Sequence, residues 1–441
     1  MTRLLFTALL YCLTPALLLR LWLRGRTLPG YRQRWRERFG HWPAMPEGAL
    51  WLHSVSVGET IAARPFVERW LARHPDIPVI ITTMTPTGSE TVQALFGDKV
   101  HHAYLPWDYP HVYRRLLPRL NPRALVIMET ELWPNLINAC DRQRVPVFLV
   151  NGRLSERSAR GYHRFRALTR PMLQQLTGIA AQHWPDAERF QALGVPAENI
   201  EVTGSIKFDL SISSKLTGDI AAFARGIKGR PVWVAASTHG GEEEGLLEVQ
   251  RRITTVLPNA LMILVPRHPD RFETVSDIVA ASGLRYSRRS QRSQPRNNDQ
   301  VYLADSLGEL MVFFGAAQVA VMGNTFNDGG GHNPIEPAAL GKPVLVGPSF
   351  TNFQSIISAM QKEQGIIVAD TLEALEKRLL GLLKSQDLRD TFGQRAYVFY
   401  QHQQGALQRL EHWLDRHLNL VDPGTDSSRR ALPPKISSDR P

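Results

Sequence analysis

The chain has little cysteine. Only two cysteines, Cys12 and Cys140, occur in 441 residues, and they lie far apart in the sequence. The first stands inside an apolar run, so a disulfide framework is excluded as the basis of the fold. This scarcity favours a reducing compartment for the folded part.

Several motifs that define large enzyme classes are also missing. The sequence has no GxxxxGK[ST] phosphate loop, no GxGxxG after a first strand, no HExxH and no paired CxxC. Their absence removes support for an ATPase, a dinucleotide oxidoreductase and a zinc enzyme. The remaining candidates for chemistry are polar clusters at the ends of predicted strands.

Acidic residues are outnumbered by basic ones. The chain has 52 Lys and Arg against 41 Asp and Glu, a formal net charge of +11, which favours an anionic partner: nucleic acid, anionic lipid or a phosphorylated substrate. Much of the excess lies in residues 20–38 and 285–296, and neither segment has the pattern of a nucleic-acid module. Hydrophobic residues make up 43% of the chain, and this length predicts two domains with a cleft.

Residues 1–24 predict a membrane anchor. From Leu4 to Leu23 the chain is almost wholly apolar, and about 20 such residues can span a bilayer. A run of arginines follows in place of a cleavage site, so a cleaved signal peptide is not expected. By the positive-inside rule the basic side, and the body with it, is cytoplasmic. Pro15 and Arg20 leave open a helix lying in the interface, but a span is the favoured interpretation.

Beyond the anchor, apolar β-branched runs alternate with amphipathic stretches, which predicts an α/β fold with two successive parallel sheets. The domains are expected at residues 25–205 and 219–390, joined by a polar linker at 206–218, with ligands at the carboxyl ends of strands. The first set of predicted strands is 49–56, 78–85, 124–129, 145–151 and 178–182, and the second is 231–237, 261–266, 301–304, 319–322, 343–346 and 365–368.

The C-terminal part predicts three further features. Leu388 to Leu420 is expected to form one long helix, and by analogy with similar architectures residues 391–420 cross back onto the first domain. Residues 421–441 are rich in Pro, Ser, Asp and Arg and predict a disordered tail. The polar run from Ser287 to Gln300 predicts a solvated loop.

The first polar cluster is WLHSVSVGET, residues 51–60. Gly58 is expected to allow a tight turn that brings Glu59 to the open edge of the domain, where it is a candidate general base. A carboxylate at a helix start is also favoured by the helix dipole alone. The second cluster, TTMTPTGSE at 82–90, suits a helix N-terminus that caps itself or holds an anion or a sugar.

Two more clusters follow in the first predicted domain. In METELWPNL, residues 128–136, Glu129 and Glu131 are expected to lie on one face of a strand end, where they bind a substrate hydroxyl or a metal. The metal is the weaker interpretation, because no aspartate or histidine partner is near in sequence. In NGRLSERS, residues 151–158, Arg153 and Arg157 are either anion contacts or surface charges.

The second domain has the more specific pattern. ASTHGGEEE (236–244) and PRHP (266–269) each follow an apolar strand, and Arg267 can neutralise a phosphate by paired hydrogen bonds. In the segment 323–348 three consecutive glycines allow close backbone approach, while His332 and Asn333 expose donors at a helix start. Glu336 can accept from two ribose hydroxyls. This assembly indicates a nucleotide site.

Six motifs in order, LHSVSVGE, TTMTPTGSE, METELWPNL, GSIKFD, LVPRHPDRF and GGHNPIEPA, resemble the bacterial Kdo transferases. These enzymes move 3-deoxy-D-manno-octulosonic acid (Kdo) from CMP-Kdo to a lipid A precursor. The resemblance extends to about residue 415 and departs at GNTFND (323–328) and at Gly152. It implies a GT-B fold in which Glu59 deprotonates a glucosamine hydroxyl of the acceptor and CMP leaves with inversion.

The resemblance also implies the binding residues. Donor-binding residues are expected to be Lys207, Ser237, Thr238, Arg267, His268, Gly331, His332, Asn333 and Glu336. Acceptor-binding residues are expected to be Ser56, Gly58, Thr83, Thr85, Glu129, Glu131 and Arg153. Arg267, Lys207 and the dipole of the helix after Gly331 stabilise the leaving phosphate on this interpretation. No metal or other cofactor is expected, in agreement with the absence of a DxD triplet.

The implied partners are CMP-Kdo, lipid IVA and the anionic lipids of the inner membrane, with no nucleic acid. A single N-terminal anchor is expected to hold the catalytic domains on the cytoplasmic face, and Arg32 to Arg38 to line the approach to the lipid. Two alternatives remain: a GT-B enzyme that uses a UDP-sugar, and a non-catalytic membrane-surface protein that binds through its charge. Transfer from UDP-sugars identifies the GT-B alternative. A function that is unchanged by Glu59→Gln identifies the non-catalytic surface protein.

Overall fold

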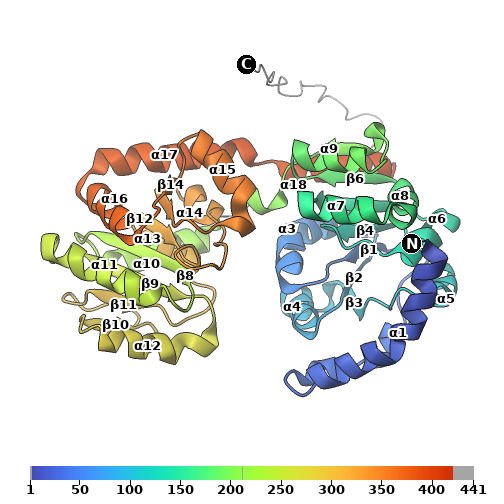
Figure 1. Ribbon diagram of the computed structural model, residues 1–441, viewed down its shortest axis with the longest axis horizontal. Coiled ribbons are helices and arrows are strands. Elements are labelled where there is room, and N and C mark those ends of the chain that lie inside the picture. The colour runs from blue at the N-terminus through green and yellow to red at the C-terminus, as the bar shows by residue number, and fades with distance from the viewer. Residues whose placement is uncertain (1, 211, 421–441) are drawn as a thin grey trace. The chain divides into compact units, whose positions relative to one another are not determined.

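The computed structural model describes residues 2–210 and 212–420, which form two compact units (Figure 1). Unit 1 comprises the described residues up to Ile206 and from Gly405 onward, and unit 2 is Lys207–Gln404. The chain therefore leaves unit 1 once and returns to it near its C-terminal end. The tail predicted at residues 421–441 lies outside the described residues.

Unit 1 is built on a seven-stranded parallel sheet with the order β3-β2-β1-β4-β5-β6-β7. Its central strands are buried on both faces, which explains their continuous apolar runs. The strands are β1 (Leu50–His53), β2 (Val79–Thr83), β3 (His101–Tyr104), β4 (Ala124–Met128), β5 (Val147–Gly152), β6 (Gly178–Ala181) and β7 (Ile200–Val202).

Helices cover both faces of this sheet (Figure 1). Leu50 and Leu52 of β1 point to one face and Trp51 to the other, so each face has its own apolar core. The first face is covered by α3 (Val57–Arg73), α4 (Pro86–Phe96) and α18 (Ala406–His417). The second is covered by α5 (Pro110–Leu120), α6 (Pro134–Arg142), α8 (Arg166–Gln174) and α9 (Trp184–Ala192). Unit 1 also contains α1 (Arg3–Arg24), η1 (Pro29–Arg32), α2 (Trp35–Arg38), η2 (Gly97–Lys99), α7 (Glu156–Arg164) and η3 (Ala197–Asn199).

Unit 2 repeats the architecture with the strand order β10-β11-β9-β8-β12-β13-β14, again all parallel. The strands are β8 (Val232–Thr238), β9 (Leu261–Pro266), β10 (Tyr286–Arg288), β11 (Val301–Leu303), β12 (Val319–Met322), β13 (Val344–Val346) and β14 (Ile367–Val368). One face packs on α10 (Ser214–Gly226), α13 (Leu310–Ala316), α14 (Ile335–Ala339), α15 (Gln354–Lys362) and α17 (Gln386–Gln403). The other packs on α11 (Glu243–Val256), α12 (Phe272–Ala281) and α16 (Leu372–Lys384). Short η4 (Ile206–Phe208), η5 (Pro269–Arg271) and η6 (Thr351–Phe353) complete the described elements.

Two sequence predictions about elements are wrong. The single helix expected from Leu388 to Leu420 is two helices, because Gly405 between α17 and α18 has φ +83, a conformation that a helix cannot continue through. The loop expected from Ser287 onward begins inside β10, and the Ser287 hydroxyl is buried and donates to Asp299. The predicted polar linker at 206–218 contains η4 and the start of α10.

In each sheet the chain order reverses beside the first strand of the unit. β1 lies between β2 and β4, and β8 lies between β9 and β12. In open α/β sheets, ligands bind outside the carboxyl ends of the strands at such a reversal. A site is therefore expected at the loops after β1 and β4, called here the reversal point of unit 1, and at the loops after β8 and β12, the reversal point of unit 2.

Among the described residues, α1 is the one helix long and apolar enough to cross a membrane. Its mean hydropathy reaches 1.9, and none of the residues in that window is buried in the protein. An N-terminal helix of this kind fits a membrane anchor.

Candidate active site

Glu59 lies in the first turn of α3, directly after the reversal strand β1. Ser56 is the N-cap residue of this helix, and its hydroxyl lies 3.1 Å from Glu59 Oε1. The Val55 N–H donates to Oε2 at 2.8 Å. This arrangement is close to a capping box, and it fixes the carboxylate at the carboxyl edge of the sheet.

The surroundings of Glu59 oppose its charge. Burial first, and then the carboxylates of Glu129 and Glu131, raise its pKa to about 7, whereas the bonds from Val55 and Ser56 oppose this rise. A carboxylate that loses its proton near neutral pH is matched to general-base work. Three acidic side chains from the loops after β1 and β4 thus act on one another at the reversal point of unit 1.

The sequence explanation for two of these positions is wrong. Strand β4 ends at Met128, and Glu129 has φ +54, so strand alternation does not place Glu129 and Glu131 on one face. Burial, and then Glu129, raises the pKa of Glu131. The loop, and not the strand, brings both carboxylates toward Glu59.

Gly58 does not form the expected tight turn. It lies within α3, and its φ is not positive. A Cβ atom at this position would meet only the Ser56 hydroxyl, at 3.9 Å, so the backbone at the start of α3 is open on this side. The absence of a side chain leaves room for a ligand beside Glu59.

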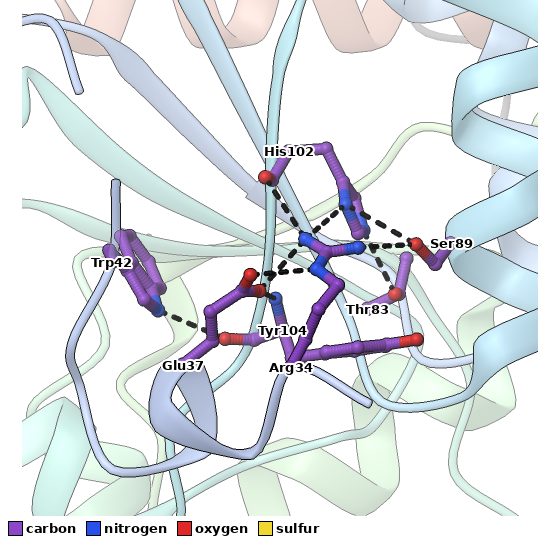
Figure 2. A network of polar contacts seen from close by, with 7 residues as sticks. All are labelled: Arg34, Glu37, Trp42, Thr83, Ser89, His102 and Tyr104. Atoms are coloured by element: carbon purple, nitrogen blue, oxygen red, sulfur yellow. Dashed lines mark hydrogen bonds and ion pairs between the residues drawn. The ribbon is translucent and has the colours of Figure 1, made fainter. Parts of the chain in front are cut away.

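Thr83 and Thr85 belong to a neighbouring polar network, which Figure 2 shows in part. The Thr83 hydroxyl lies 3.1 Å from Nε2 of His102, and Thr85 is the N-cap of α4, accepting from the Gly88 N–H at 3.1 Å. Arg34 donates to Ser89 Oγ at 2.8 Å. The sequence placed Arg34 in the basic segment Arg32 to Arg38 but not beside the threonine cluster, and it did not single out His102.

Arg34 and Arg38 are engaged in the fold. Arg34 forms a bidentate pair with Glu37 at 2.7 and 2.8 Å, and the Tyr104 N–H donates to the same carboxylate at 2.9 Å (Figure 2). Arg38 is buried and donates to the Met84 carbonyl. These two arginines therefore hold α2 on the sheet. Fewer side chains of the segment Arg32 to Arg38 are then available for the contact with lipid that the sequence predicted.

Arg153 is exposed in the loop after β5. Its carbonyl accepts a hydrogen bond from the Thr130 hydroxyl, which ties this loop to the one carrying Glu129 and Glu131. The pKa of His183, at the start of α9, is lowered by burial and also by the charge of Arg153. Arg153 thus contributes a positive charge to the carboxyl edge of unit 1.

The reversal point of unit 2 gathers three histidines. His239 Nε2 lies 3.0 Å from Nε2 of His332, and their rings stack with centroids 5.1 Å apart. The ring of His268 meets His239 edge-on at 5.0 Å. His268 and His332 were predicted from sequence, whereas His239 was not, although it stands in the ASTHGGEEE motif.

Burial and nearby charges lower the pKa of two of these histidines. Burial first, and then His239, Arg267 and His268, lower the pKa of His332 to about 4, and burial is also the largest cause that lowers the pKa of His239. Burial raises the pKa of Glu336, while Arg267 opposes that rise. The exposed guanidinium of Arg267 therefore acts on imidazoles whose lowered pKa values, at His239 and His332, favour the neutral form, an arrangement that suits an anion with adjacent hydrogen-bonding groups.

Glu242 is a second residue that the sequence did not single out. This buried carboxylate accepts from the backbone N–H groups of His239 at 2.8 Å, Asn324 at 2.6 Å and Phe326 at 3.4 Å. It joins the loop after β8 to the glycine-rich loop after β12. Its role is to hold the two loops together.

The remaining predicted donor residues lie at the end of β8 and on the loop after β12. Ser237 is buried with φ +59, and the buried Thr238 Oγ1 has no hydrogen-bond partner within the part of the chain that the structure describes. Gly331 has φ +79, and its N–H donates to the Asn324 carbonyl at 2.7 Å. Asn333 Oδ1 accepts from the Ile335 N–H at 3.2 Å.

One expectation for the donor side changes, and another stays untested. The helix after Gly331, α14, has only five residues, so its dipole is too small to carry the expected stabilisation. Lys207 lies partly buried in η4 as the first residue of unit 2, and its donor role stays a prediction. Within residues 2–210 and 212–420, no group of three or more His, Cys, Asp or Glu side chains is arranged to hold a metal ion.

The fold and the two sites define a class of enzyme. Residues 278–399 match the family model described as glycosyl transferases group 1. The UDP-GlcNAc 2-epimerase of Neisseria meningitidis has a similar fold, with a TM-score of 0.59 and 15% identity over 83% of this chain and all of that one. The protein is a glycosyltransferase with a GT-B fold.

The family follows from closer relatives. Residues 33–210 match the model described as 3-deoxy-D-manno-octulosonic-acid transferase (kdotransferase). The chain is 40% identical to the 3-deoxy-D-manno-octulosonic acid transferase of Haemophilus influenzae, covering 93% of this chain and 97% of the relative. The corresponding protein of Bordetella pertussis is 36% identical, with 93% and 99% covered. The chain belongs to the 3-deoxy-D-manno-octulosonic acid transferase family, as the sequence motifs predicted.

Proposed function

We propose that the protein transfers Kdo from CMP-Kdo to lipid IVA in lipopolysaccharide biosynthesis, with inversion at the anomeric carbon and Glu59 as general base. The observation that supports this most is the position of Glu59. It lies at the reversal point of unit 1, it is fixed by two hydrogen bonds, and its pKa of about 7 suits a base at neutral pH.

On this proposal the acceptor hydroxyl approaches over the open backbone at Gly58. Glu59 takes the hydroxyl proton as the oxygen attacks the anomeric carbon of Kdo, and the bond from that carbon to the CMP phosphate oxygen breaks. Burial first, and then Glu129 and Glu131, keep the pKa of Glu59 high, so that the carboxylate has enough proton affinity for the transfer. Ser56, Thr83, Thr85 and Arg153 complete the proposed acceptor surface.

Unit 2 is the proposed donor-binding unit. Arg267 pairs with the CMP phosphate and stabilises the charge that grows on it as the glycosidic bond breaks. The imidazoles of His268 and His332 and the orphan Thr238 hydroxyl supply hydrogen bonds, and Glu336 accepts from the ribose. Ser237, Gly331 and Asn333 shape the loops around the nucleotide, and Lys207 provides a second cation. No metal takes part in this proposal.

The lipid acceptor requires a position at a membrane. α1 supplies an apolar anchor, and the arginines that follow it favour the cytoplasmic face of the inner membrane and contact with anionic lipids. The same positive charge fits the phosphates of the lipid A precursor. Nucleic acid is not a proposed partner.

The proposal is tested by transfer to a tetraacylated lipid A precursor from CMP-Kdo generated in place, read by mass spectrometry. A lipid whose mass rises by one or more Kdo residues with CMP-Kdo, and does not rise with UDP-sugars, supports the donor and the acceptor together. Transfer from a UDP-sugar alone identifies the other GT-B alternative. No transfer from either donor, together with retained membrane binding, identifies a non-catalytic surface protein.

A further inference from the structure

Helix α1 has two faces of different character. Its polar residues Arg3, Thr7 and Thr14 recur at helical spacing and are partly buried against unit 1. Leu10, Leu17, Leu18 and Leu21 share the same stripe and pack on Trp107, Tyr109 and Val112. One stripe of the helix is therefore docked on the protein from end to end.

The docked stripe makes specific polar contacts. Arg3 Nη1 donates to Asn135 Oδ1 at 3.2 Å, and the Thr7 hydroxyl lies 3.1 Å from the same oxygen. Further along, the Thr14 hydroxyl lies 2.5 Å from the Tyr109 hydroxyl. The Tyr11 hydroxyl lies 2.5 Å from His111 Nδ1.

The partners of the stripe are themselves fixed in the body. Asn135 is buried, and its N–H donates to Asp108 Oδ2 at 2.8 Å while its side-chain amide donates to the Asp108 carbonyl at 2.7 Å. Asp108 also accepts from the Leu136 N–H at 2.8 Å and so caps α6. α1 thus docks on a rigid part of unit 1.

The opposite face of α1 is apolar and open. Its leucines are each between 44% and 77% exposed: Leu4, Leu5, Leu9, Leu13, Leu19 and Leu23. Cys12 lies among them, and no charged side chain interrupts this face before Arg20. Such a face requires an apolar environment, which the acyl region of one lipid leaflet provides for a helix that lies in the membrane plane.

The geometry conflicts with a helix that crosses the bilayer. From Arg3 to Leu21 the docked stripe is about 27 Å long, close to the roughly 30 Å of the hydrocarbon core. If α1 spanned the membrane and kept its contacts, then Asn135, Asp108 and His111 would lie at hydrocarbon depth. If α1 spanned alone, every contact of the stripe with unit 1 would be lost, and Thr7 and Thr14 would keep only the hydrogen bonds that their hydroxyls donate to the Arg3 and Leu10 carbonyls of the helix itself.

We propose that α1 is an in-plane anchor: its polar stripe stays docked on α5 and α6, its leucine face enters one leaflet of an anionic membrane, and it does not cross. The proposal rests on the membrane attachment proposed above and replaces the span that the sequence favoured. At the end of the helix, Arg26 and Arg32 stack over Trp22 at 4.7 and 4.8 Å, which fits the head-group level. Arg20 and Arg24 add charge for anionic lipids.

The first test compares the side of the membrane on which two engineered thiols lie. In a Cys12→Ser background, Thr2→Cys reports the start of α1 and Lys228→Cys reports the body, because both positions are exposed and Cys140 is buried. A membrane-impermeant maleimide is applied to spheroplasts and to inverted vesicles. The in-plane anchor predicts labelling of both thiols from the same side. Labelling from opposite sides would overturn it and establish a span.

A second test asks whether the docked stripe persists in the membrane. Tyr11→Cys with His111→Cys is expected to be bridged by a short bis-maleimide in native membranes, whereas Leu9→Cys with His111→Cys, on the open face, is not. Equal bridging of the two pairs would contradict docking. Cell fractionation tests membrane attachment separately, because the labelling pattern reports only the side on which each thiol lies. Recovery of the protein in the soluble fraction at ordinary salt would refute membrane attachment itself.

Discussion

The two units place opposite chemistry at the same point of the same architecture. At the reversal point of unit 1, burial first and then the nearby Glu129 and Glu131 raise the pKa of Glu59. At the reversal point of unit 2, burial first and then the nearby His239, Arg267 and His268 lower the pKa of His332. Three carboxylates act on one another in unit 1, whereas unit 2 brings together three imidazoles and a guanidinium, with Glu336 beside them.

This difference indicates which step of the proposed reaction each unit performs. Burial together with repulsion among carboxylates produces a group that accepts a proton at neutral pH. A guanidinium beside imidazoles of lowered pKa, those of His239 and His332, produces a surface that binds an anion without competing for protons. One reversal point is thus fitted to take the proton from the acceptor, and the other to hold the nucleotide.

Replacing the base is expected to have the largest effect. Glu59→Gln keeps the shape of the side chain but cannot take the proton, so kcat for Kdo transfer should fall by about 10²–10⁴-fold. Glu68→Gln, on the exposed side of the same helix, is the matched control and should leave kcat unchanged. Steady-state kinetics that show equal rates for the two variants would remove Glu59 from the mechanism.

Removing the cation of unit 2 is expected to act on binding. Arg267→Ala deletes charge-assisted hydrogen bonds to the phosphate, so affinity for CMP should fall by roughly 10–100-fold. Arg225→Ala, an exposed arginine at the end of α10, should leave affinity unchanged. Calorimetric titration with CMP measures both variants, and an unaltered Kd for Arg267→Ala would place the nucleotide elsewhere.

A carboxylate of unit 2 should behave as a structural group. Glu242→Ala leaves three backbone N–H groups without their acceptor, and we expect it to lower the free energy of unfolding by roughly 3 kcal/mol. Glu244→Ala, exposed on the same segment, should change it by less than about 0.5 kcal/mol. Urea denaturation distinguishes the two, and a Glu242→Ala chain as stable as wild type would contradict the loop-holding role.

The smallest expected effect is a shift of the pH profile. Glu59 is protonated below its pKa of about 7, so transfer should rise as pH increases through that value. Glu129→Gln removes one repelling charge and should move the rise to lower pH by less than one unit. Folding stability has the opposite slope, because a raised carboxyl pKa favours the folded state at low pH and this contribution is lost as pH rises through 7. An unshifted rate profile would mean that Glu129 does not act on the base.

Much of the fold could be predicted because the central strands are apolar runs. The strands missed were β3, β7 and β10, which lie at or next to sheet edges and carry polar residues such as His101, Glu201 and Arg288. An edge strand is buried less, so its sequence lacks the apolar signal. The break at Gly405 was missed because the helical pattern continues on both sides of it.

The site was predicted where motifs follow strands and missed where contacts join distant segments. Glu59, Arg267 and His332 stand in such motifs. His239 became visible only through its contact with His332, and Arg34 only through its bond to Ser89. The positive φ of Glu129 likewise depends on the loop as a whole and has no local pattern.

One paired measurement tests the division of labour most directly: CMP affinity and Kdo transfer, determined side by side for Glu59→Gln and Arg267→Ala. The account predicts that Glu59→Gln binds CMP like the wild type but transfers almost no Kdo, whereas Arg267→Ala loses CMP affinity. Loss of CMP binding in Glu59→Gln, or full transfer by it, would contradict the assignment of proton transfer to unit 1 and nucleotide binding to unit 2.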